Sequence, residues 1–296
     1  LKYHTFRSFL CNMSSSMMKF IKIVFFLFCF VCYSQVIQAQ WKSQRFAGVG
    51  LKDGQPALQV PLYKARGLYV SSSGNVMYGE SENYRVRELD VSSGVINTIV
   101  GSGQREGVNT GNPANPLGPL NRGISFVTEV EQDANGNLFI ASERIYRVDA
   151  ATKNITEHKI LIASQEKAID DFVIAPNGNL LLVNRFDNTV MRFDTVSKVT
   201  TVIAGTGSPG TSSDGLDALS TSFTSIEHIA LAANGDIYVA DRVENKIRKI
   251  RASDNKVETV AGTGTAGFSG DGGQATSAEL SQPYDMVFDS SGDLIF

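Results

Sequence analysis

The sequence is poor in the residues from which most compact metal and redox sites are built. Its 296 residues include only three cysteines, Cys11, Cys29 and Cys32, so the chain after residue 40 has none. That part of the chain cannot form a disulfide, a zinc–thiolate site or a cysteine nucleophile. A domain without disulfides relies on its hydrophobic core, and a chain of about 256 residues is long enough to build one.

Histidine and strong charge are also scarce. Only His158 and His228 follow residue 40, and no Gly-x-Ser-x-Gly sequence occurs. Two histidines without a third partner do not make a histidine metal site, and a serine hydrolase of the nucleophile-elbow type is unsupported. His228 is expected on an inner strand near a central channel. The net charge is −3, and −7 for residues 41–296 because the four charged residues before Trp41 are all basic. Nucleic acid is therefore not an expected partner, since its binding normally requires a basic face.

The first 40 residues have the layout of an export signal. Lys19 and Lys22 precede an apolar run, Ile23–Tyr33, and small residues follow it. We predict a signal peptide over residues 17–39 and an upstream extension over residues 1–16. The alternative is an uncleaved signal anchor, but a transmembrane helix needs about 20 apolar residues and this run is shorter.

The remainder consists of short apolar-patterned runs separated by turns. Within residues 226–262 these runs are His228–Leu231, Asp236–Asp241, Lys246–Arg251 and Lys256–Gly262. None reaches helical length and no gap could hold a crossover helix, so the pattern predicts a four-stranded antiparallel meander. Asn234-Gly235 is the firmest turn signal, because Asn-Gly tolerates the positive φ of tight hairpin turns.

Three sequence markers repeat in phase. The turn between the first two runs recurs at Gly74, Gly136, Gly178, Gly235 and Gly292, with spacings of 62, 42, 57 and 57. An Ala-Gly-x-Gly-type tetrapeptide ends units at residues 47–50, 100–103, 204–207 and 261–264. Asp-Gly-x-x-Ala occupies linking loops at residues 53–57, 214–218 and 271–275, with a variant at residues 110–114. The spacing of 42 arises because the long glycine-rich loop is missing between Asn154 and Phe172. Self-similarity of this period, with four strands per unit, predicts propeller blades.

These markers resemble the NHL repeat family. The resemblance is closest in residues 238–248 and 259–264, and it continues through the Phe-Ser-Gly-Asp-Gly-Gly loop at residues 268–273. That long-loop variant is similar to NHL propellers of teneurin ectodomains and of secreted microbial or protist proteins. The resemblance implies an all-β propeller of four-stranded blades over residues 41–296, six-bladed when complete. Four blades and part of a fifth are expected here, and Trp41–Phe296 alone should expose two sheet edges and aggregate.

Several polar groups suggest ligand sites, and each has a structural alternative. The loop around Asp271 could bind phosphate or calcium, but it offers one carboxylate and no following helix, so a turn is predicted. Asp241 and Asn245 are spaced like a metal pair, yet Asn184 and Asn188 hold the same places one blade earlier. We predict that these side chains bond backbone groups at a strand–turn–strand junction. No cofactor, metal ligand or catalytic residue is assigned.

The expected binding residues lie in long loops. In an up-and-down meander, the connections between blades and the turns between second and third strands share one face, whereas Lys256 belongs to a turn on the other. Long loops on a rigid scaffold usually carry binding residues. The candidate contacts on this interaction face are Arg105, Asp214, Asp217 and Asp271. Phe268, in the same loops, is expected to pack inward.

The predicted function is that of a secreted or cell-surface propeller that binds a protein or glycan without catalysis. The alternative is a lactonase-like or lyase-like propeller enzyme with a metal in the central channel, held by scattered Glu, Asp and Asn. Asn154-Ile155-Thr156 is the only glycosylation sequon after the signal peptide, in a predicted turn where a glycan would fit.

Overall fold

The computed structural model describes residues 53–56, 60, 62, 64–103, 105, 120 and 122–296. They belong to one compact unit that spans residues 52–296. The predicted upstream extension and signal peptide lie outside the described residues. Among the helices of the described residues, none is long and apolar enough to cross a membrane.

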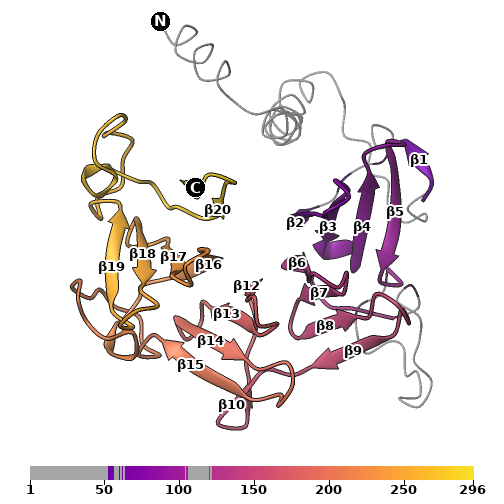
Figure 1. Cartoon of the computed structure of the whole chain (residues 1–296), viewed down its shortest axis with the longest axis horizontal. Coiled ribbons are helices and arrows are strands. Elements are labelled where there is room, and N and C mark those ends of the chain that lie inside the picture. The colour runs from indigo at the N-terminus through magenta and orange to yellow at the C-terminus, as the bar shows by residue number, and fades with distance from the viewer. Residues whose placement is uncertain are drawn as a thin grey trace, which may run out of the picture. The chain divides into compact units, whose positions relative to one another are not determined.

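Four antiparallel four-stranded blades form a β-propeller, as the repeats predict. Blade 1 contains β2 (Ala65–Val70), β3 (Val76–Glu80), β4 (Arg85–Asp90) and β5 (Val95–Val100). Blade 2 contains β6 (Glu129–Gln132), β7 (Leu138–Ala141), β8 (Ile145–Val148) and β9 (Ile155–His158). Blade 3 contains β12 (Asp171–Ile174), β13 (Leu180–Asn184), β14 (Thr189–Phe193) and β15 (Thr200–Ala204). Blade 4 contains β16 (Ile226–Leu231), β17 (Ile237–Asp241), β18 (Lys246–Ile250) and β19 (Val257–Ala261). The first strand of each blade lies toward the centre and the last toward the outside (Figure 1).

Shorter elements lie between and beside the blades. β1 (Gln55–Pro56) pairs with β5, and β20 (Val287–Phe288) pairs with β21 (Leu294–Ile295) in a further sheet. A hairpin of β10 (Leu161–Ile162) and β11 (Gln165–Glu166) stands where the glycine-rich loop is missing. The helices within the described residues are three-residue 3-10 turns: η3 (Ser81–Asn83), η5 (Ala218–Ser220) and η6 (Ala275–Ser277).

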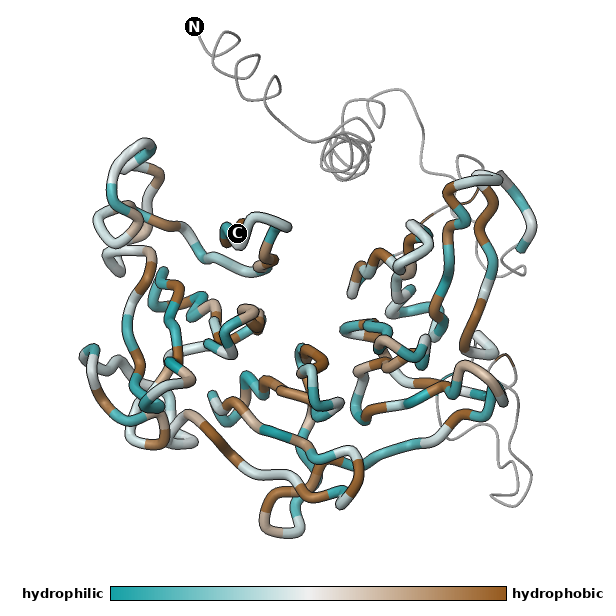
Figure 2. Tube along the Cα trace, viewed as in Figure 1, coloured by the Kyte–Doolittle hydropathy of each residue, from teal (hydrophilic) through white to brown (hydrophobic). Residues whose placement is uncertain are grey.

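The hydrophobic core lies between successive blades. Leu181 and Val183 of blade 3 cluster with Ile229 and Val239 of blade 4, and similar clusters join blades 1 and 2 and blades 2 and 3. Apolar residues occur in every blade (Figure 2), and β7 and β13 are buried along their whole length. This is expected for sheets that pack neighbours against both faces. Each blade therefore depends on adjacent blades for its core.

The Ala-Gly-x-Gly marker brings the end of each outer strand against the turn between the second and third strands. Gly262 has φ +92°, and a Cβ added there would lie 2.2 Å from the Asn245 carbonyl oxygen. Gly205 approaches the Asn188 carbonyl in the same way in blade 3, and Gly101 approaches the Tyr84 carbonyl in blade 1. Glycine is needed because a side chain at this position would both clash and strain the backbone.

The Asn-Gly turn differs in detail from the prediction. The Ala232 N–H donates to the Asp236 carbonyl, and the Gly235 N–H donates to the Ala232 carbonyl, so the turn is longer than two residues. Gly235 has φ +89°, whereas Asn234 keeps a negative φ. The asparagine contributes its side chain instead, since Asn234 Oδ1 accepts the Asp236 N–H at 3.0 Å.

Candidate binding face and channel cluster

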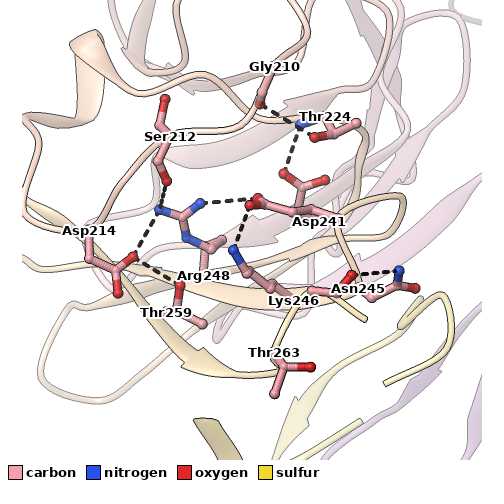
Figure 3. Close-up of polar contacts among 12 residues, drawn as sticks. Gly210, Ser212, Asp214, Thr224, Asp241, Asn245, Lys246, Arg248, Thr259 and Thr263 are labelled. Carbon is pink, nitrogen blue, oxygen red and sulfur yellow. Dashed lines mark hydrogen bonds and ion pairs between the residues drawn. The ribbon is translucent and has the colours of Figure 1, made fainter. Parts of the chain in front are cut away.

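Asp214, a predicted interaction residue, belongs to a polar cluster in blade 4 (Figure 3). Its Oδ1 accepts hydrogen bonds from Arg248 Nη2 at 3.2 Å and from Thr259 Oγ1 at 2.9 Å. Arg248 is completely buried and also donates to Glu244 Oε2 at 3.2 Å and to the Ser212 carbonyl at 3.1 Å. The Asp214 carboxylate therefore helps neutralise a buried guanidinium, which gives it a role in folding.

Blade 1 repeats this arrangement. Asp53 Oδ1 lies 3.3 Å from Nη2 of Arg87, which is also completely buried, and it accepts hydrogen bonds from the backbone N–H and hydroxyl of Thr98. Blade 3 has no Asp-Gly-x-x-Ala segment before it, and there Met191 and Val202 occupy the paired positions held by arginine and threonine in blades 1 and 4. The marker aspartate is thus the partner of a buried arginine in the following blade.

The same segment extends down the outer edge of blade 4. The Gly215 N–H donates to the Val257 carbonyl, and the Val257 N–H donates to the Leu216 carbonyl. Asp217 Oδ1 lies 3.2 Å from Lys256 Nζ. The expectation that this loop and Lys256 lie on opposite faces is wrong, because backbone pairing with β19 carries the loop along the edge. Whether Asp214, Asp217 or the exposed Asp271 contacts a partner stays a prediction.

Phe268 also departs from its predicted position. Its side chain is 90% exposed rather than packed inward. The Glu279 N–H donates to the Ser269 carbonyl. This hydrogen bond closes the loop between Ser269 and Glu279, and Phe268 precedes the closed part. By contrast, Asp241 and Asn245 bond backbone groups as predicted: Asp241 accepts N–H bonds at 2.8 and 2.9 Å, and Asn245 Oδ1 accepts one at 2.9 Å.

The turns between second and third strands lie at one end of every blade. They comprise residues 81–84, 142–144, 185–188 and 242–245, and we call this end the turn face. The ends of the blade connections lie against it: the Arg242 N–H donates to the Ser225 carbonyl, and the Gln282 N–H donates to Asn245 Oδ1. The prediction that connections and turns share a face is therefore confirmed for the loop ends.

Three arginine–aromatic pairs are exposed on the turn face. The pairs are Arg105–Phe126, Arg185–Phe186 and Arg242–Tyr284. Their distances from the guanidinium carbon to the ring centre are 5.2, 5.1 and 6.0 Å, respectively. Arg105 also donates to Glu143 of a blade 2 turn at 2.8 Å. The three arginines are about half exposed, and the rings of Phe126, Phe186 and Tyr284 are 38%, 70% and 45% exposed. Of these six residues, sequence reasoning identified only Arg105.

A buried carboxylate links two of the pairs. Glu227 is 6% exposed, and its two oxygens lie 3.6 Å from Nη1 of Arg185 and 3.6 Å from Nη1 of Arg242. Asp170 Oδ1 lies 3.1 Å from Arg185 Nε, and Gln282 Oε1 accepts from Arg242 Nη2 at 2.8 Å. Glu227 therefore holds the two guanidiniums next to each other at the turn face.

A second polar cluster lies on the inner strands. His228 of β16 has Nδ1 3.0 Å from Asp171 Oδ2 and 3.2 Å from Asp285 Oδ1. Burial alone would lower the pKa of His228, but the carboxylates of Asp171, Asp285 and Glu129 outweigh it and raise the pKa to about 9. Burial, with the nearby Asp171 carboxylate, raises the pKa of Glu129 well above its usual range. Burial raises the pKa of Glu131 to about 7. At neutral pH the imidazole is therefore protonated among carboxylates.

Two further sequence expectations concern metal and glycan. Within the residues that the structure describes, no group of three or more His, Cys, Asp or Glu side chains could hold a metal ion. Asn154 is exposed in the turn before β9, where the sequence predicts it. Its glycosylation stays a prediction.

Comparison with known proteins identifies the repeat and the fold. No protein-family model matches the chain. NHL repeat-containing protein 2 of Homo sapiens is 34% identical over 128 residues, which cover 43% of this chain and 16% of that protein. The chain thus matches a small part of that relative's length.

Several solved structures resemble the chain at low sequence identity. A structural genomics protein of unknown function from Bacteroides thetaiotaomicron has a TM-score of 0.54 at 20% identity, covering 83% of this chain and 69% of its own. An auxiliary nutrient binding protein from the same species has a TM-score of 0.50 at 18% identity, covering 84% and 69%. Streptogramin B lyase has a TM-score of 0.50 at 14% identity, covering 85% and 67%. These likenesses support the propeller fold alone. With the 34% identical relative and the repeat markers, they lead to one conclusion: the chain is a β-propeller whose repeats are similar to those of an NHL repeat-containing protein.

Proposed function

We propose that this propeller is a non-catalytic binding scaffold whose turn face binds a protein or glycan partner. The observation that carries the proposal is the set of three exposed arginine–aromatic pairs. Arginine and aromatic side chains are enriched where proteins bind partners, because they combine directional hydrogen bonds with large apolar area. The propeller supplies the rigid support that such a site needs.

The test compares two pairs of substitutions in the full chain. Arg185→Ala with Arg242→Ala removes two turn-face guanidiniums, whereas Arg192→Ala with Arg251→Ala removes two arginines that lie away from that face. Both variants would be screened with the unsubstituted chain against glycan and secreted-protein arrays. We expect partners to be lost only in the turn-face variant. Partners that survive in that variant, or that are lost equally in both, would contradict the proposal.

We further propose that the chain enters the secretory pathway and is secreted or held at the cell surface. The proposal rests on the export signal predicted at residues 17–39, and an extracellular binding role agrees with the auxiliary nutrient binding protein among the structural neighbours. N-terminal sequencing of expressed protein should find a start near residue 40, and a start at Met17 would contradict export. Treatment with a glycosidase should reduce the mass if Asn154 carries a glycan.

A second candidate function is that of a channel enzyme, lactonase-like or lyase-like. The observation that favours it is His228 of the inner strand β16, whose imidazolium lies against Asp171 and could serve as a proton donor. A metal held in the channel is the other form of this candidate. Lactone hydrolysis or lyase activity that His228→Gln abolishes, in a protein that remains folded, would favour the enzyme over the scaffold.

A further inference from the structure

We propose that the ligand of the turn face is a carboxylated glycan, that is, a chain containing uronic acid residues. This inference rests on the proposed function and names the ligand class of the same face. It depends on Arg185, Arg242 and the rings beside them, with Arg105 and Phe126 as a further contact point.

Arg185 and Arg242 remain able to bind a carboxylate. Each guanidinium has five N–H donors. Their separations of 3.6 Å from Glu227 are too long for hydrogen bonds, so Glu227 attracts and orients the two cations without occupying their donors. A ligand carboxylate could therefore form charge-assisted, two-pronged hydrogen bonds with either guanidinium. Because Glu227 is buried, the guanidiniums are oriented before the ligand arrives.

The rings next to these arginines suit a flat, partly apolar ligand unit. Phe186 and Tyr284 each lie beside an arginine and expose much of their surface. A sugar ring presents C–H groups on its faces, which can cover an aromatic ring, and its hydroxyls can bond neighbouring acceptors such as Asp170 and Gln282. A uronic acid residue combines such a face with one carboxylate, and so fits one arginine–aromatic pair.

The distribution of the pairs favours a chain of sugars over a folded protein partner. The pairs form two groups. Arg105 and Phe126 lie near blades 1 and 2, and the other two pairs, which share Glu227, lie near blades 3 and 4. Protein interfaces have a continuous, well-packed apolar centre. Two groups of rings and cations in different blades instead match a ligand that repeats.

The charge of the protein limits how acidic this ligand can be. Residues 41–296 carry a net charge of −7, which repels dense polyanions such as heparin or nucleic acid. Recognition must then depend on local contacts in which an aromatic ring and an arginine of the protein bind a sugar ring and its carboxylate. The expected ligand has one carboxylate per sugar and no sulfate.

The experiment measures binding of labelled hexamers of galacturonate, glucuronate and mannuronate to the full chain by fluorescence polarisation. At least one should bind, and the fully methyl-esterified form of that hexamer, which keeps the rings but loses the carboxylates, should bind at least tenfold more weakly. Arg185→Ala with Arg242→Ala should weaken binding tenfold or more, since each removes charge-assisted hydrogen bonds. Phe186→Ala should weaken it severalfold, and Arg192→Ala with Arg251→Ala less than twofold.

Three results would overturn the inference. One is that none of the three hexamers binds, and another is that the esterified form binds equally well. The third is that polyglutamate binds as tightly as the hexamer, which would assign the face to an acidic polypeptide. If the array screen finds a partner that depends on Arg185 and Arg242 while every uronate hexamer fails, the inference falls and the proposed binding face stands. If no partner depends on these arginines, both fail.

Discussion

Replacing Asp214 by alanine should destabilise the propeller, although this residue lies in a long surface loop. The carboxylate accepts two hydrogen bonds, one of them from the completely buried Arg248. A hydrogen bond to a charged group contributes about 1.5–3 kcal/mol, and water replaces part of it because Asp214 is half exposed. We therefore expect Asp214→Ala to lower the free energy of unfolding by about 2 kcal/mol, measured by urea denaturation with circular dichroism.

The structure offers matched comparisons for this substitution. Asp53→Ala should also destabilise the fold, since Asp53 forms an ion pair with the buried Arg87 and accepts a hydrogen bond from Thr98 Oγ1 in blade 1. Asp254→Ala should change the free energy of unfolding much less than Asp214→Ala, because its bond to Arg251 is an exposed surface pair. If Asp214→Ala were as harmless as Asp254→Ala, the buried arginine would not depend on the loop and the reasoning would fail.

A double substitution tests the coupling directly. Arg248→Met copies the Met191 of blade 3, where the loop aspartate is missing. Glu244 would keep its bond to Lys246 Nζ at 2.7 Å. Since apolar residues often replace a buried ion pair without loss, Asp214→Ala should lower the free energy of unfolding by about 1–2 kcal/mol less in the Arg248→Met background than alone. Equal costs in both backgrounds would show that the two residues act independently.

Three further predictions concern other parts of the blade pattern. Folding raises the pKa of His228 from 6.5 to about 9, so protonated His228 stabilises the fold fully below pH 6.5, and this stabilisation is lost as the pH rises through 9. Between pH 6.5 and 9 the free energy of unfolding should therefore fall by about 3 kcal/mol. His228→Gln should reduce that slope in a pH series of urea denaturations, and an unchanged slope would count against the imidazolium. Gly262→Ala should lower the free energy of unfolding by about 3 kcal/mol. Gly178 also has a positive φ but has no atom within 4 Å of an added Cβ, so Gly178→Ala should lower it by about 1 kcal/mol through backbone strain alone. Equal shifts of the thermal unfolding midpoint would contradict the close approach at Gly262. Asp214 precedes its arginine by 34 residues and its threonine by 45, so any longer form of this sequence should carry Arg and Thr at those distances after Asp271, which sequencing the gene would check.

The blade strands could be predicted because their signals are local. The four runs within residues 226–262 agree with β16 to β19. A short apolar-patterned run between two turns is enough to place a strand. The role of Asp214 was missed because its partner lies in another part of the blade. A signal was present: in blades 1 and 4 an arginine and a threonine follow the marker aspartate at equal distances, and blade 3 lacks all three. Correlated positions of this kind indicate contact within a repeat.

The turn face could not be recognised in the same way, because its pairs follow the repeat only in part. Arg185 and Arg242 hold equivalent places, one residue after Asn184 and Asp241, whereas the rings beside them do not. Phe186 is next to Arg185 in sequence, but Tyr284 reaches Arg242 from the loop that leads to β20, and Phe126 reaches Arg105 across a blade connection. Phe186 lies in a turn inside a blade, whereas Tyr284 and Phe126 lie in connections between blades, so no single spacing predicts all three rings. The three pairs share a position at one end of the propeller, the turn face, and this face forms only when the blades pack together. Selection for a stable blade would repeat the same residues, as it does for the Asp–Arg–Thr clusters. Exposed rings that share an end without sharing a repeat position are better explained by a ligand, and this contrast is why we assign binding to the turn face.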